Sequence, residues 1–131
     1  MSKALLIVLF LITLFITSCT KPQDQEENTT YQKITPEVAK SMIDQDSSII
    51  ILDVRRQDEY DNGHIPNAIL IPDYEILEKA ESILKDKNQT ILIYCRSGNR
   101  SKKAALNLID LGYKQVYDFG GIIDWPYDLV K

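Results

Sequence analysis

Residues 90–111 read TILIYCRSGNRSKKAALNLIDL and join an apolar segment to an amphipathic one through a short polar turn. The four residues at 91–94 are apolar or favour strands, which is typical of a buried strand. Apolar residues then recur at helical spacing from Ala104 to Leu111, and they predict a helix over residues 101–111. The turn between them, residues 95–100, holds one thiol, two guanidinium groups and a glycine.

A turn that connects a strand to a helix concentrates positive potential. Its backbone N–H groups and the helix dipole point toward one place. Such a field favours the thiolate form of a cysteine and binds oxyanions. Cys95 therefore lies where a nucleophilic thiolate is expected, in a loop suited to a sulfur or phosphorus oxyanion. The competing interpretation is an inert core cysteine, which is common for this residue type.

Composition limits what the loop can bind. The chain has 131 residues, enough for one domain, and a formal net charge of -4. No basic stretch is long enough to indicate nucleic-acid binding. Arg96 and Arg100 are therefore a local concentration of positive charge in an acidic chain, which favours a small anionic substrate. One histidine and two cysteines cannot complete a zinc site, and we expect no metal and no cofactor.

The N-terminal segment predicts export. Residues 4–16 form an apolar run that is short for a membrane-spanning helix but typical of a signal sequence. Residues 16–19, ITSC, resemble a bacterial lipobox. That resemblance implies a lipoprotein signal peptide at 1–18, cleavage before Cys19, and lipid on the Cys19 sulfur. The protein would then be anchored to the extracytoplasmic face of a membrane in the bacterial cell envelope. The alternative is an uncleaved anchor.

The segments after Cys19 predict a tether and one domain. Residues 19–33 are polar, acidic and without periodicity, so they predict a flexible, lipid-anchored tether, with a domain over 34–131. A short first strand at 31–34 is also compatible with the sequence. Thr35 and Pro36 predict the start of a helix that ends near 45–47. The apolar run at 49–52 is typical of a strand buried on both faces of a parallel sheet.

The rest of the chain alternates in the same way. We expect short elements that include a helix at 56–61 stopped by Gly63, a strand at 68–71, a helix at 73–84 and a strand at 115–119. This alternation predicts an α/β fold with a mainly parallel sheet of about five strands and helices on both faces. Asp53 and Cys95 both follow buried strands, so they should share the rim where such sheets bind ligands.

Four blocks of this chain together resemble a single-domain rhodanese, from about residue 34 to the C-terminus. The blocks are LDVR at 52–55, EY and GHIP at 59–60 and 63–66, YCRSGNRS at 94–101, and GG at 120–121 followed by Trp125. The resemblance implies a thiosulfate sulfurtransferase, in which Cys95 takes up sulfane sulfur as a persulfide and passes it to cyanide or a thiol. It also implies a rhodanese-like fold, and we expect a monomer.

The resemblance further assigns roles to the residues around Cys95. Arg96 and Arg100 would attract thiosulfate, and Asp53 and Arg55 would brace the loop and the neighbouring turns. The outer sulfur would be held by the backbone N–H groups of Arg96, Ser97, Gly98, Asn99, Arg100 and Ser101.

Two alternatives compete with a sulfurtransferase. Cysteine-dependent phosphatases and arsenate reductases also hold a thiolate in an arginine-containing loop, but theirs has Cys-x5-Arg spacing. Here the spacing from Cys95 to Arg100 is Cys-x4-Arg, which makes a smaller ring of amides suited to one sulfur atom. The second alternative is a tethered binding or sensing module without turnover, which the intact loop disfavours.

Two aromatic or ionisable residues receive structural interpretations. His64 could act as a general base, but we interpret it as a turn residue whose ring nitrogen bonds a backbone carbonyl, because a base must reach its nucleophile. Trp125 is interpreted as part of the core, since large aromatic side chains dominate core burial.

Overall fold

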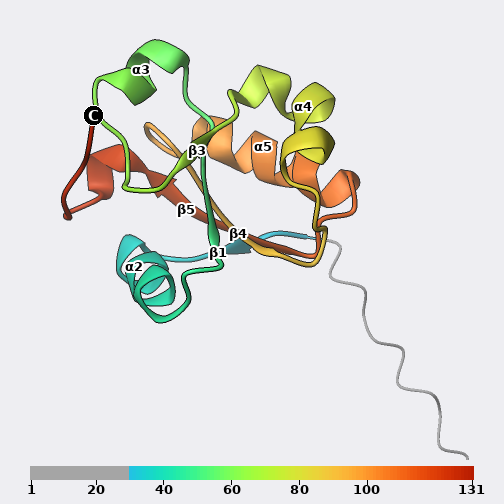
Figure 1. Ribbon diagram of the computed structural model, residues 1–131, viewed down its shortest axis with the longest axis horizontal. Coiled ribbons are helices and arrows are strands. Elements are labelled where there is room, and N and C mark those ends of the chain that lie inside the picture. Colours follow the sequence, from blue (N-terminus) through green and yellow to red (C-terminus); the bar gives the residue numbers. More distant parts are fainter. Residues whose placement is uncertain (1–29) are drawn as a thin grey trace, which may run out of the picture.

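The structure of residues 30–131, a computed structural model, is built on a parallel sheet (Figure 1). In these residues the sheet has five strands in the order β1-β5-β4-β2-β3, and every neighbouring pair is parallel. The strands are β1 (Gln32–Lys33), β2 (Ile50–Asp53), β3 (Ile69–Leu70), β4 (Thr90–Cys95) and β5 (Gln115–Gly121). The predicted fold class, α/β with a parallel sheet, is confirmed.

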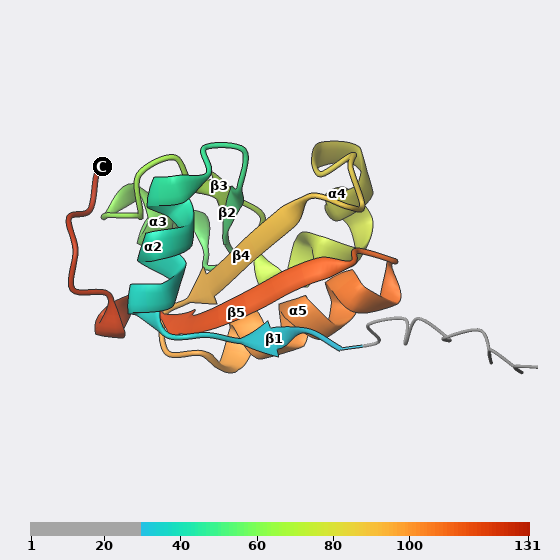
Figure 2. The same cartoon turned by 90° about the horizontal axis from the view of Figure 1, so that it is seen from below.

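Helices cover both faces of this sheet. They are α2 (Pro36–Gln45), α3 (Gln57–Asp61), α4 (Ile76–Ile83) and α5 (Asn99–Asp110), with 3₁₀ turns at Asp73–Glu75 and Ile122–Asp124. Figure 2 shows α2 and α5 on opposite sides of β4 and β5. Thr35 caps α2 as predicted, because its side chain accepts a hydrogen bond from the Val38 N–H at 3.3 Å.

The side chains of the central strand β4 alternate between two hydrophobic clusters, one on each face of the sheet. Ile91, Ile93 and Cys95 belong to the cluster formed with α4 and α5, whereas Leu92 and Tyr94 belong to the cluster formed with α2. Successive side chains of a strand point to opposite faces, so a continuous apolar run serves both clusters. Cys95 therefore faces α5, the helix that follows its loop.

The structure shifts several predicted boundaries. The predicted tether includes Gln32 and Lys33, but these residues form β1 and pair with Tyr117 and Asp118 of β5. The short first strand that the sequence allowed at 31–34 is therefore present, and the domain begins at least two residues before the predicted position 34. The last strand also continues past the predicted 119 to Gly121.

The helix after the loop starts earlier than its apolar pattern indicates. We predicted residues 101–111, and α5 begins at Asn99. Its N-cap is Gly98, whose φ of +102° is a left-handed conformation that glycine adopts without steric cost. The first turn of α5 is polar, which is why the apolar periodicity missed it.

The predicted signal peptide, Cys19 and most of the predicted tether lie outside the described residues. Within residues 30–131, none of the helices combines the length and the apolar character needed to cross a membrane.

Candidate active site

Cys95 is the last residue of β4 and is almost fully buried, with 1% of its surface exposed. It is the free cysteine of the described part of the chain. The next three residues form the turn, and α5 begins at Asn99. The strand, turn and helix predicted from residues 90–111 are thus present, with the thiol at the base of the loop.

Two groups contact the sulfur of Cys95. The Gly98 N–H donates a hydrogen bond to Cys95 Sγ, with a distance of 3.0 Å between nitrogen and sulfur. The thiol in turn donates to Ser101 Oγ at 3.5 Å. The Ser101 hydroxyl lies within 3.2 Å of the Gly98 carbonyl oxygen and 3.4 Å of the Gly120 carbonyl oxygen. The described contacts therefore place Gly98 and Ser101 directly at the sulfur, while the predicted role of the remaining loop amides stays a prediction.

The C-terminal end of β5 packs closely against the cysteine loop. Cys95 is in register with Gly121, after an irregularity between Ile93 and Cys95. A Cβ atom on Gly121 would lie 2.1 Å from the Arg96 carbonyl oxygen and 2.6 Å from Ser97 Cα. Only a glycine lets the strand approach the loop this closely. Gly120 and Gly121 lie beyond the predicted end of the last strand at 119, and in the structure both belong to β5.

A buried carboxylate holds the neighbouring backbone. Asp118 is 2% exposed, and its Oδ1 accepts a hydrogen bond from the Gly120 N–H at 2.9 Å. Its Oδ2 is buried without a hydrogen-bond partner among the described residues. Gly120 in turn offers its carbonyl oxygen to Ser101, which contacts the sulfur. Asp118 could not be predicted from the sequence, because an acid in a strand normally indicates a solvent-facing position.

Arg100 has a partner that the sequence did not predict. Its two terminal nitrogens donate to the two carboxylate oxygens of Glu59, at 2.7 and 2.8 Å, in a bidentate pair that joins α5 to α3. The hydrogen bond from Arg100 lowers the pKa of Glu59 from its ordinary value of 4.5 to about 2, and the same bond raises the pKa of Arg100. Arg100 therefore fastens the loop to α3, and its predicted contact with thiosulfate stays a prediction.

The Glu59 pair predicts a pH-dependent stability. Folding lowers the pKa of Glu59. The contribution of its charged form to the free energy of unfolding is therefore complete above about pH 4.5 and is lost as the pH falls toward 2. Glu59→Gln is expected to lower the free energy of unfolding by about 1–2 kcal/mol at pH 7. Urea unfolding at pH 7, 5 and 3 measures this loss of stability, and a Glu78→Gln variant at an exposed position is the control. An equal deficit at pH 7 and pH 3 would contradict the role of the charged pair.

Asp53 and Arg55 form a buried network at the end of β2. Arg55 donates to both carboxylate oxygens of Asp53, with the shortest contact 2.7 Å, and also to the Gly63 carbonyl oxygen at 2.7 Å. The Tyr94 hydroxyl donates to Asp53 Oδ2 at 2.6 Å, and burial together with Asp53 raises the pKa of Tyr94. Among the described contacts these residues brace the turn at Gly63, and they reach the loop only through Tyr94, which precedes Cys95.

His64 has the structural role predicted from the sequence. Its Nδ1 lies 3.0 Å from the Tyr60 carbonyl oxygen, and its ring stacks on the Tyr60 ring with centroids 3.7 Å apart. Its backbone pairs with Val130 in an isolated antiparallel bridge. His64 therefore orders a turn and the C-terminal segment.

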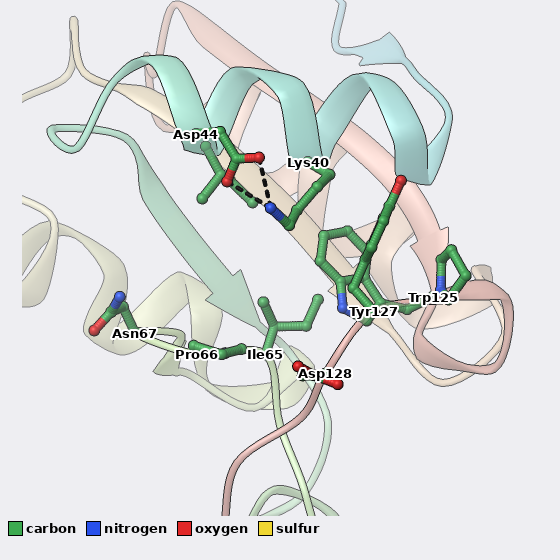
Figure 3. Close-up of a pocket in the computed structure, with 10 residues that line it drawn as sticks. Lys40, Asp44, Ile65, Pro66, Asn67, Trp125, Tyr127 and Asp128 are labelled. Atoms are coloured by element: carbon green, nitrogen blue, oxygen red, sulfur yellow. Dashed lines mark hydrogen bonds and ion pairs between the residues drawn. The ribbon is translucent and has the colours of Figure 1, made fainter.

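Two hollows flank this part of the molecule. One, of about 310 Å³, lies beside the loop and is bordered by Arg56, Arg96 and Ile123. The other, of about 470 Å³, lies between α2 and residues 125–128 (Figure 3). Its polar lining includes the Lys40–Asp44 ion pair, and no residue of the cysteine loop borders it. Trp125 lines the larger hollow and is 8% exposed, so its predicted place in the core is confirmed.

These features agree with comparisons to known proteins. Residues 35–126 match the family model of the rhodanese-like domain. The chain is 37% identical to YrkF of Bacillus subtilis (strain 168) over 101 residues, which are 76% of this chain, and it spans about half of that protein, 54%. It is 36% identical over 80 residues to the thiosulfate sulfurtransferase PspE of Escherichia coli (strain K12), covering 61% of this chain and 77% of that protein.

Solved structures lead to the same family. A rhodanese-related protein from Thermoplasma volcanium superposes with a TM-score of 0.67 at 32% identity, covering 76% of this chain and 98% of that one. This chain likewise has an α/β domain with a parallel sheet and a cysteine loop at the carboxyl end of its central strand. This chain belongs to the rhodanese-like domain family.

Proposed function

We propose that the protein is a sulfurtransferase that moves sulfane sulfur from thiosulfate, or a similar anionic donor, to a thiol or cyanide. The observation that carries this proposal is the position of Cys95 Sγ, at the base of a short loop and 3.0 Å from the Gly98 N–H. A backbone donor there stabilises negative charge on sulfur. Homologues named thiosulfate sulfurtransferases support the same reaction class.

In the first step, the Cys95 thiolate attacks the outer sulfur of thiosulfate. A bond forms between Cys95 Sγ and that sulfur, and the sulfur–sulfur bond of thiosulfate breaks with its electron pair leaving on sulfite. Cys95 then carries a persulfide. Arg96, with an exposed side chain, is suited to attract the dianionic donor, and sulfite needs no proton to leave. The step therefore requires no general base, which agrees with the structural role of His64.

In the second step, a thiolate or cyanide attacks the outer sulfur of the persulfide. The new bond joins the acceptor to that sulfur, and the electron pair of the broken bond returns to Cys95 as a thiolate. Donors placed about 3 Å from developing charge are the usual source of electrostatic catalysis. The Gly98 N–H, at 3.0 Å from Cys95 Sγ, meets this distance for the leaving thiolate.

The competing functions predict different kinetics. A sulfurtransferase working through a persulfide is expected to give parallel lines in double-reciprocal plots for thiosulfate and cyanide, because sulfite leaves before the acceptor binds. It should hydrolyse no aryl phosphate. Initial rates over a grid of both substrates test this expectation. Intersecting lines, or aryl phosphatase activity without sulfur transfer, would overturn it, and inactivity with both substrate classes would favour a binding module.

We also propose that the domain is tethered to a membrane through lipid on Cys19. The support is the sequence alone: the apolar run at 4–16, the ITSC motif, and the polar segment that follows. Two acyl chains on one cysteine are sufficient for stable anchoring, because each buried CH₂ contributes about 0.8 kcal/mol. Cys19→Ala is expected to leave an unprocessed precursor or a released protein. Membrane fractionation and mass measurement that match the wild type would contradict this proposal.

A further inference from the structure

The hollow beside the cysteine loop has no role in the reaction steps described above. Its volume is about 310 Å³, within the size range of small-molecule sites. Arg96 borders it and directly follows Cys95, and the Ile123 N–H donates to the Arg96 carbonyl oxygen at 3.3 Å. Its lining therefore begins at the loop and extends onto the 3₁₀ turn that follows β5.

The charges around this hollow are not balanced. Arg55 is neutralised by Asp53 and Glu59 by Arg100, so neither residue needs a ligand. The Arg96 guanidinium has no hydrogen-bonded or ionic partner within residues 30–131. Arg56 makes only long contacts with carboxylates, 3.3 Å to Asp58 and 3.8 Å to Glu59.

Solvent weakens these contacts further, since 63% of the Arg56 side chain and 69% of the Asp58 side chain are exposed. Two arginines without a strong partner thus line one hollow in a chain of net charge -4.

The same hollow has an apolar wall. Ile122 and Ile123 line it, and Ile123 is 63% exposed, which is high for a large aliphatic side chain. Thiosulfate and cyanide have no apolar part to cover this wall, and both are small for the volume. The combination of two guanidiniums and an aliphatic wall suits a molecule with carboxylates on a short carbon skeleton.

We propose that this hollow binds the carboxylate-bearing part of a small thiol, which is the sulfur acceptor. The inference rests on the proposed sulfurtransferase function and names the class of its acceptor. The carboxylates pair with Arg56 and Arg96, and the skeleton covers Ile123. The thiolate attacks the outer sulfur of the Cys95 persulfide, forming a new sulfur–sulfur bond. The bond from Cys95 Sγ to the outer sulfur breaks, its electron pair returns to Cys95, and the acceptor leaves as a persulfide.

The second half-reaction tests this proposal in isolation. Protein loaded with thiosulfate and freed of excess donor is mixed with mercaptosuccinate, which carries two carboxylates, or with neutral 2-mercaptoethanol. The measured quantity is the ratio of the two rate constants for loss of the extra sulfur. Arg56→Gln is expected to lower the mercaptosuccinate-to-mercaptoethanol ratio about tenfold relative to the wild type. Added salt should reduce this difference, because Arg56 is exposed.

Lys102→Gln is the matched control. Lys102 is an exposed cation in the first turn of α5 that does not line the hollow, so its loss should leave the ratio within about twofold. An unchanged ratio in Arg56→Gln, or an equal fall in Lys102→Gln, would overturn the hollow as the acceptor site. Failure of thiosulfate to load sulfur at all would instead overturn the proposed function, since no acceptor is present in that step.

Discussion

Cys95→Ser is expected to abolish sulfur transfer, with a loss of at least about ten-thousandfold in turnover. The hydroxyl of serine does not ionise near neutral pH and forms no persulfide. Serine also has nearly the shape of cysteine, so it can keep the contacts with Gly98 and Ser101. The fold should therefore survive. Steady-state rates with thiosulfate and cyanide measure the loss, and circular dichroism with urea unfolding confirms the fold.

A folded Cys95→Ser protein that retains more than a trace of turnover would contradict a covalent intermediate on Cys95. The comparison is direct because Cys95 is the free cysteine of residues 30–131. In the full chain the predicted lipid on Cys19 would block the other thiol. A protein lacking residues 1–19 removes that second sulfur from the assay altogether.

Gly121→Ala is expected to be the most damaging change outside the nucleophile. Its φ of -118° is open to any residue, so backbone conformation is not the obstacle. The obstacle is steric, because the new Cβ would lie 2.1 Å from the Arg96 carbonyl oxygen. The loop must move by about an ångström, and a shift of that size can cost about a hundredfold in rate. Overpacking should also lower the free energy of unfolding by about 3 kcal/mol.

Gly120→Ala provides a matched control one residue away. A Cβ at Gly120 meets no atom within 4 Å, but its φ of +89° is unfavourable for alanine. This variant should lose about 1–2 kcal/mol of stability, with a much smaller change in rate. Kinetics of persulfide formation in the folded fraction separate the two variants. Equal rates for Gly121→Ala and the wild type would show that the close approach does not hold the loop.

Local sequence patterns predicted the parts of the site that are local in the chain. The strand, turn and helix around Cys95 are contiguous, so a change of hydrophobic period within 22 residues marks them. The structural role of His64 was predicted because a base must reach its nucleophile, and the carbonyl it contacts, that of Tyr60, is only four residues away. The α/β fold class followed from the alternation of such segments.

Long-range contacts could not be predicted from those patterns. Glu59 and Arg100 are 41 residues apart, and an acid in the first turn of a short helix indicates only favourable helix electrostatics. Arg100 was therefore assigned to the substrate, although Glu59 occupies its guanidinium in the structure. Asp118 and Gly121 gain their roles from how closely β5 approaches the loop, a property of packing between neighbouring strands. Arg56 became a candidate binding residue only when folding placed it on the lining of the same hollow as Arg96.

The central claim is that Cys95 carries sulfur, and the mass of the protein tests it most directly. Purified protein is incubated with thiosulfate, freed of excess reagent, and its mass is measured before and after cyanide. The account predicts a gain of one sulfur atom, located on the peptide containing Cys95, which cyanide removes and which Cys95→Ser never acquires. An unchanged mass after thiosulfate, or a gain that persists in Cys95→Ser, would contradict it.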